Sequence, residues 1–168
     1  MAGAAFVLQN RDMPYDSVKR GLLFLVLGLS LIWVQPVRAA LGSDAASVLT
    51  DGAELQGAVN SVPGQQYDID EINAASGVRV REFLNRNGIV FAVTWSGPVV
   101  PDLRMLLGSS FDSYTKAVAA LKQPGLHRSL RIATPELVVE SGGHMRAYSG
   151  RAYLPPLIPA GASTADLR

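Results

Sequence analysis

The sequence predicts an α+β fold, a single small domain in which an antiparallel β-meander packs against one long or kinked helix, after an N-terminal signal peptide. Three β-rich runs lie between residues 65 and 98, a stretch with helical spacing covers residues 102–122, and further β-rich runs occupy residues 136–155. Strands, then a helix, then strands are typical of a domain whose helix covers one face of an antiparallel sheet.

The first 39 residues have the pattern of a signal peptide. Lys19 and Arg20 precede the apolar run GLLFLVLGLSLIWV, and Val37 and Ala39 are the small residues expected before a cleavage site. A membrane-spanning helix needs about 20 apolar residues, so an uncleaved signal anchor is the less favoured alternative. Met13 is an alternative start. We therefore expect a periplasmic or secreted protein with no membrane span after cleavage.

Removal of the leader leaves 129 residues, which suits one domain. Four of the 15 Lys and Arg and two of the 14 Asp and Glu lie in the leader, so the mature chain carries a net charge of −1 and gives no support for nucleic-acid binding. Because the chain has no cysteine, disulfides, thiol catalysis and cysteine-bound metals are excluded. No phosphate-binding glycine loop or dinucleotide motif is present, so no cofactor is predicted.

The mature chain divides into three parts by composition. Residues 40–64 are rich in small residues and are expected to be a weakly structured N-terminal segment. Residues 65–154 carry the α+β pattern, and residues 155–168 are expected to form a proline-rich C-terminal tail. Within the predicted helix, Asp102 can cap the start, and Gly108-Ser109-Ser110 can introduce a kink.

Asn87-Gly88 predicts a hairpin with a two-residue loop. That register pairs three couples across the two strands: Leu84 with Phe91, Glu82 with Val93, and Val80 with Trp95. The predicted apolar face consists of Val78, Val80, Leu84, Phe91, Val93 and Trp95. The opposite, polar face consists of Arg79, Arg81, Thr94 and Ser96, diluted by Phe83 and Ala92.

This register also points Glu82 into the apolar face. An ionised carboxylate there is costly unless it is paired, so we expect either a basic partner, with Arg104 and Arg146 as candidates, or a raised pKa in a pocket. The first alternative is favoured, since buried charges are usually paired structurally.

A second hairpin is predicted around Ser149-Gly150 in the stretch SGGHMRAYSGRAYLP. This register gathers a set of polar and aromatic residues on one side: His144, Arg146, Tyr148, Arg151 and Tyr153. Each arginine can lie over the tyrosine opposite it, which would make the hairpin structural. The alternative is a binding platform for an anionic or sugar-containing polymer.

The remaining motifs carry weak signals. Asp68, Asp70 and Glu71 could bind calcium, but the EF-hand spacing is missing, and a cross-strand ion pair between Asp70 and Arg81 is preferred. His127 and His144 have no partners at zinc-binding spacing. Adjacent His144 and Met145 would point to opposite faces of a strand and so could not share a copper ion. No metal site is therefore predicted.

Several of these stretches together carry a family resemblance. They are ALG (residues 40–42), GVRVREF (77–83), GIVFAVTWSGPVVPDLRMLLG (88–108), SGGHMRAYSGRAYLP (141–155) and PAG (159–161). They resemble the pattern of a family of exported bacterial proteins, the domain-of-unknown-function family 2844. The resemblance implies an envelope or secreted location in a Gram-negative bacterium and no assigned activity, cofactor or catalytic residue.

Two hypotheses on function follow. The first is an exported envelope protein that acts as a non-catalytic binding or structural module, whose partner is an envelope polymer or another exported protein. The alternative is a hydrolase or other enzyme that acts on an envelope polymer with Glu82 as its acid/base group.

Overall fold

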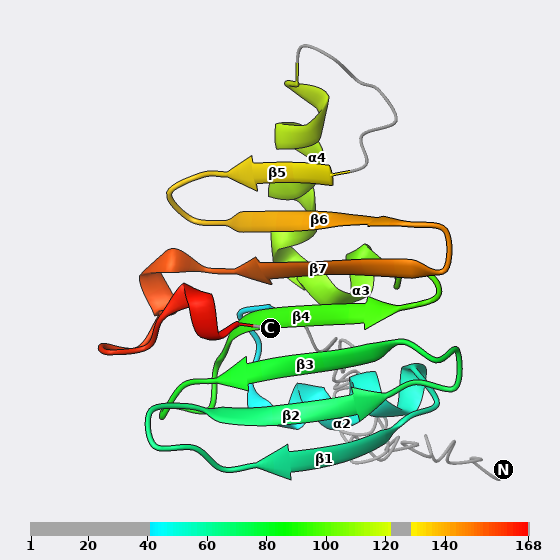
Figure 1. Cartoon of the computed structure of the whole chain (residues 1–168). Coiled ribbons are helices and arrows are strands. Elements are labelled where there is room, and N and C mark those ends of the chain that lie inside the picture. The colour runs from blue at the N-terminus through cyan, green and yellow to red at the C-terminus, as the bar shows by residue number, and fades with distance from the viewer. Residues whose placement is uncertain (1–40, 122–128, 168) are drawn as a thin grey trace, which may run out of the picture. The chain divides into compact units, whose positions relative to one another are not determined.

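The computed structural model describes residues 41–121 and 129–167, which form a seven-stranded antiparallel sheet with strand order β1-β2-β3-β4-β7-β6-β5 (Figure 1). The strands are β1 (Ala58–Val62), β2 (Asp68–Asn73), β3 (Arg79–Leu84), β4 (Val90–Gly97), β5 (Ser129–Ala133), β6 (Val138–His144) and β7 (Ala147–Tyr153). Two meanders therefore meet where β4 pairs with β7. The predicted α+β class is confirmed.

The helices lie together on one face of the sheet (Figure 1). Helix α2 spans Ala45–Glu54, and the predicted helical stretch forms α3 (Leu103–Leu107) and α4 (Phe111–Ala119), joined by a 3-10 turn. Asp102 caps α3 by accepting a hydrogen bond from the Arg104 N–H at 2.8 Å. The predicted kink lies at Gly108, whose φ of 47° suits glycine. No helix in the described ranges is long and apolar enough to cross a membrane.

The main core lies between the helices and the sheet. Val48 from α2 and Leu106 from α3 pack with inward residues of the central strands, among them Val80, Val93 and Trp95. These three strand residues were predicted to face the core, and each is almost completely buried. Alternation of side chains along β3 and β4 therefore predicted this face correctly.

A second, smaller core lies on the opposite face of the sheet. Its buried members are Phe83, Phe91, Ala92, Val138, Tyr153 and Leu167. The chain after β7 folds back over this face through two short 3-10 turns, Pro155–Leu157 and Thr164–Asp166 (red end of the chain in Figure 1). The proline-rich segment is thus a packed cover of the sheet, which differs from the expected tail.

The segment before residue 65 also differs from the expectation of weak structure. It contains α2 and β1 as well as the entry stretch, where the Gly42 N–H donates to the Val90 carbonyl at 2.8 Å. Asp44 caps α2 through a hydrogen bond from the Ser47 N–H. The segment is rich in small residues and has few large apolar side chains, so packing against the sheet, rather than strong local periodicity, stabilises it.

The loop between β3 and β4 is longer than predicted. Gly88 N–H donates to the Asn85 carbonyl and Asn85 N–H to the Ile89 carbonyl, so the loop has three residues, with positive φ at Gly88 and not at Asn87. A β-bulge at Phe91 then restores the predicted register from Phe83 onward. The pairing of Leu84 with Phe91 was therefore wrong: Leu84 pairs with Val90, and Phe91 turns to the second core.

The turn predicted at Ser149-Gly150 is also wrong. The chain turns at Met145-Arg146, where Arg146 has a φ of 65°, and Ser149 and Gly150 lie inside β7. Gly150 is required there by close approach: a Cβ atom on it would lie 2.3 Å from Cζ2 of Trp95. The glycine thus marks a site where the indole ring packs on the backbone and not a turn.

Candidate functional site

Strand pairing arranges the open face of the sheet in parallel rows. The apolar row is buried beneath the C-terminal segment. Next to it runs a charged row across five strands: Arg81, Thr94, Arg151, Glu140 and Arg131. A further row lies on the same face, two residues away from the charged row on each strand. It consists of one arginine and four small residues: Arg79, Ser96, Ser149, Gly142 and Ser129. These rows follow from facing residues sharing one side of an antiparallel sheet.

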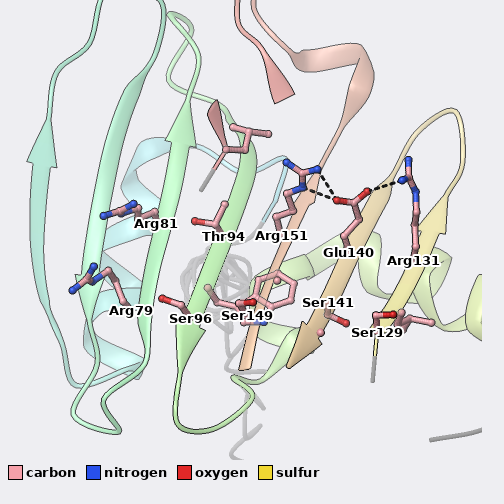
Figure 2. A pocket seen from close by; sticks show the side chains of 15 residues that line it. Arg79, Arg81, Thr94, Ser96, Ser129, Arg131, Glu140, Ser141, Ser149 and Arg151 are labelled. Atoms are coloured by element: carbon pink, nitrogen blue, oxygen red, sulfur yellow. Dashed lines mark hydrogen bonds and ion pairs between the residues drawn. The ribbon is translucent and has the colours of Figure 1, made fainter. Parts of the chain in front are cut away.

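The difference in side-chain size between the last two rows creates a groove. Serine and glycine leave the surface low, whereas the neighbouring arginines stand above it, and the resulting hollow has a volume of about 680 Å³. Figure 2 shows Arg79 and Arg81 at one side of the groove and Arg131 at the other, with the serines between them. The groove lies on the face opposite the α-helices, because its arginines and serines alternate along the strands with the helix-facing residues Val80, Val93 and Trp95.

Two glutamates hold the four arginines of the groove. Glu71 on β2 lies 2.8 Å from Arg81 and 3.7 Å from Arg79. Glu140 lies 2.6 Å from Arg151 and 3.3 Å from Arg131 (Figure 2). Hydrogen bonding from Arg81 is the main cause that lowers the pKa of Glu71, so this carboxylate stays ionised. Four arginines against two glutamates leave this region with a net positive charge.

Arg151 also links the groove to the C-terminal segment. Its Nη1 donates to the Thr164 carbonyl at 2.6 Å, and its Nε donates to Glu140 at 2.7 Å. The guanidinium lies over the ring of Tyr153, 6.0 Å from the ring centre. This contact joins residues of one strand, whereas a contact across the hairpin was expected. Arg151 is therefore firmly held by the fold.

The other residues of the predicted platform are dispersed. His144 and Arg146 lie at the exposed end of the β6–β7 hairpin. Tyr148 is the neighbour of the groove residue Ser149 in β7, so it belongs to the opposite side of the sheet. Tyr153 is buried in the second core. The structure therefore brings only Arg151 of this set into the groove. A role in binding for the remaining residues stays a prediction.

Glu82 is buried on the helix-facing side of the sheet, as its predicted position opposite Val93 required. The favoured basic partner is not found among the described residues: Arg104 lies over the Phe111 ring, Arg146 lies in the hairpin turn, and the neighbour of Glu82 is Asp51 of α2. Burial, followed by the contact with Asp51, raises the pKa of Glu82 to about 9. Glu82 does not line the groove.

Asp51 shares this environment. Burial raises its pKa to about 6, while the hydrogen bond with Glu82 acts in the opposite direction. Apart from the carboxyl proton that the pair shares, no N–H group and no serine, threonine or tyrosine hydroxyl of the described residues donates to either oxygen of Asp51 or to Oε2 of Glu82. Nearby Glu54 and Asp70 add negative charge, which disfavours ionisation further. Two ionised carboxylates would repel each other in this buried site. At least one of the two carboxyl groups therefore keeps its proton.

The acidic run in β2 forms ion pairs. Glu71, and not Asp70, lies opposite Arg81, because the loop between β2 and β3 also has three residues. Asp68 lies 3.9 Å from Arg86. Within residues 41–121 and 129–167, no group of three or more histidine and acidic side chains is placed to hold a metal ion. His127 lies outside the described residues.

Part of the groove could be read from the sequence. Arg79, Arg81, Thr94 and Ser96 were predicted on one polar face, and the structure places all four on the groove side. Arg131 and Glu140 were missed because β5 is a short strand without a strong pattern, and because the misplaced hairpin turn hid which residues of β6 and β7 share a face. Asp51 could have been noticed as an acid at the spacing of the buried residues Ser47 and Val48.

The comparisons with known proteins support a family but no function. A family model described as "Protein of unknown function (DUF2844)" matches residues 37–167. No curated protein and no solved structure matches the chain. The match covers the groove, the buried acid pair and the C-terminal cover alike, and it agrees with the resemblance seen in the sequence motifs. The chain therefore belongs to the DUF2844 family of proteins of unknown function.

Proposed function

We propose that the chain is an exported envelope protein that acts as a non-catalytic binding module, with its ligand lying in the groove on the open face of the sheet. The observation that carries this proposal is the groove itself. Its volume of about 680 Å³ is in the range typical of ligand sites, and arginine and serine side chains from separate strands converge on it. A sheet is a rigid support for such a site, since each row is held by backbone pairing on both sides.

Export is proposed from the leader pattern in residues 1–39. A location in the envelope of a Gram-negative bacterium agrees with the resemblance discussed above. The absence of cysteine is compatible with this location because the two cores stabilise the domain without disulfides.

The enzymatic alternative places the chemistry on Glu82. A general acid or base must come within hydrogen-bonding distance of the group that it protonates or deprotonates. Glu82 is 1% exposed and points toward the helices, on the opposite side of the sheet from the groove. A polymer in the groove would not reach it. We therefore favour binding without catalysis.

The test compares retention by the wild-type chain with retention by a variant whose groove is filled. Both are purified in the processed form that the cells accumulate, immobilised, and incubated with an extract of the same envelope. Ser149→Trp places a bulky ring on the groove floor, whereas Ser113→Trp on exposed α4 is the matched control. Near-ultraviolet circular dichroism checks that both variants are folded.

We expect a polymer or a protein that the wild type and Ser113→Trp retain and Ser149→Trp does not. Material that all three retain equally would place the binding surface elsewhere. The polymer is then recovered and its chain length measured, because shortening by the wild-type chain would contradict the non-catalytic assignment.

A further inference from the structure

The floor of the groove offers hydroxyl groups in a line. Ser96, Ser149 and Ser129 lie in one row across the sheet, and all three are exposed. Among the described residues, none of these hydroxyls is hydrogen-bonded to another protein group. Each hydroxyl can both donate and accept a hydrogen bond. Such a row is suited to a ligand that itself carries many hydroxyl groups.

The two ends of the groove carry the arginines that are most free to bind a ligand. Arg79 and Arg131 have 53% and 72% of their side chains exposed, and their ion pairs are the longer ones, at 3.7 Å and 3.3 Å. Arg151, by contrast, is fixed by Glu140 and the Thr164 carbonyl. A ligand carboxylate can therefore gain a guanidinium at either end without breaking a tight ion pair.

The spacing of these two arginines indicates an extended ligand. Arg79 is on β3 and Arg131 on β5, which are four strand intervals apart in the order β3-β4-β7-β6-β5. At about 4.8 Å for each interval, their backbones are roughly 19 Å apart. A small anion could not contact both arginines, whereas a chain that crosses the strands could.

We propose that the groove binds a linear acidic oligosaccharide, with carboxylates near Arg79 and Arg131 and sugar hydroxyls on the intervening serines. This inference rests on the proposed function and names its ligand class. The charged and the small-residue rows contain no aromatic side chain on which a nucleic-acid base would stack. The hydroxyl floor likewise favours a sugar over an apolar peptide.

The probe is tetragalacturonate, a linear acidic oligosaccharide, and its fully methyl-esterified form is the matched uncharged control. Binding to the wild-type chain is measured by isothermal titration calorimetry at low and at high salt. The variants Arg79→Gln, Arg131→Gln and their combination remove the charges at the two ends. Arg146→Gln removes the same charge from the exposed hairpin turn outside the groove.

We expect the acid to bind, the methyl ester to bind more weakly, and added salt to weaken binding of the acid. Each single groove variant should weaken binding of the acid roughly tenfold, and the double variant more, while Arg146→Gln leaves it unchanged. Equal binding of acid and ester, or equal loss in all three single variants, would overturn the assignment of the arginines.

Failure of this inference can be told apart from failure of the proposed function. If tetragalacturonate does not bind, but retention from the envelope extract still depends on the groove, the ligand class is wrong and the groove remains the binding site. If retention does not depend on the groove either, both proposals fail.

Discussion

The carboxyl groups of Asp51 and Glu82 meet between helix α2 and the sheet, where only 1% of each residue is exposed. Both pKa values are raised, to about 6 and about 9, chiefly by burial. At neutral pH, Glu82 is therefore protonated and Asp51 carries the charge. The packing of α2 on the sheet thus depends on one retained proton.

The first prediction is that the free energy of unfolding falls as the pH rises from about 4.5 to about 9. Unfolded carboxyl groups release their protons near pH 4, whereas the folded pair retains them to higher pH, so the folded state binds more protons in this window. Each tenfold difference in proton affinity corresponds to about 1.4 kcal/mol, which makes the loss several kcal/mol. Thermal unfolding measured across this pH range checks it.

Glu82→Gln tests the cause. A neutral amide resembles the protonated carboxyl in the folded protein and cannot ionise in the unfolded one, so stability near pH 4 should change little, whereas the variant should unfold at an increasingly higher temperature than the wild type as the pH rises toward 9. Glu136→Gln, at an exposed loop position, is the control and should retain the wild-type slope. Parallel stability curves for the wild type and Glu82→Gln would show that the pair does not control the pH dependence.

The second prediction concerns processing. Signal peptidase should cleave between Ala39 and Ala40, because Val37 and Ala39 occupy the positions of small residues before the cleavage site. Mass spectrometry of the protein from the cell envelope should find a chain that begins at Ala40. A mature protein that still contains Gly21 to Val34 would contradict both the cleavage and the expectation that no membrane span remains after it.

The third prediction is that Gly150→Ala is destabilising, by about 1–3 kcal/mol. The added Cβ would lie 2.3 Å and 2.5 Å from atoms of the Trp95 ring and 2.8 Å from the Glu140 carbonyl oxygen, so the ring or strand β6 must move. Ser149→Ala, next to it on the exposed side, should change stability by less than about 0.5 kcal/mol. Urea unfolding of the two variants decides the matter, and equal effects would be inconsistent with close packing of Trp95 on Gly150.

The fourth prediction separates the two residues of the Asn-Gly pair. Gly88→Ala should cost about 1 kcal/mol because Gly88 has a φ of 73°, although space for a Cβ is available. Asn87→Ala should be nearly neutral, since Asn87 does not have a positive φ. A two-residue type I′ turn would require positive φ at both positions, and comparable losses in the two variants would favour that turn.

The fifth prediction is that the C-terminal segment contributes to stability. Leu167 is 3% exposed and packs in the second core, so Leu167→Ala should cost about 2 kcal/mol or more. Leu157→Ala, at a position in the same segment that is 36% exposed, is the control and should cost less. Chemical unfolding measures both. Wild-type stability in Leu167→Ala would show that the segment is not a necessary cover for Phe83 and Phe91.

The sequence by itself determined the α+β class, the kinked helix with its Asp102 cap, the inward face of β3 and β4 except for Phe91, and the burial of Glu82. All of these depend on local rules. Side chains alternate between the two faces of a strand, and a helical face repeats every three to four residues, so a short window of sequence contains the information. The polar face that carries Arg79 and Arg81 was found in the same way.

Only the tertiary structure decided the loop lengths, the partner of β4, and the neighbour of Glu82. A three-residue loop followed by a bulge at Phe91 gives the same register beyond the bulge as a two-residue loop, so alternation could not distinguish them. The groove exists because β4 pairs with β7, and the proton is shared because α2 places Asp51 against β3. These contacts join residues far apart in the chain, and their free energy depends on burial, which a local pattern does not contain.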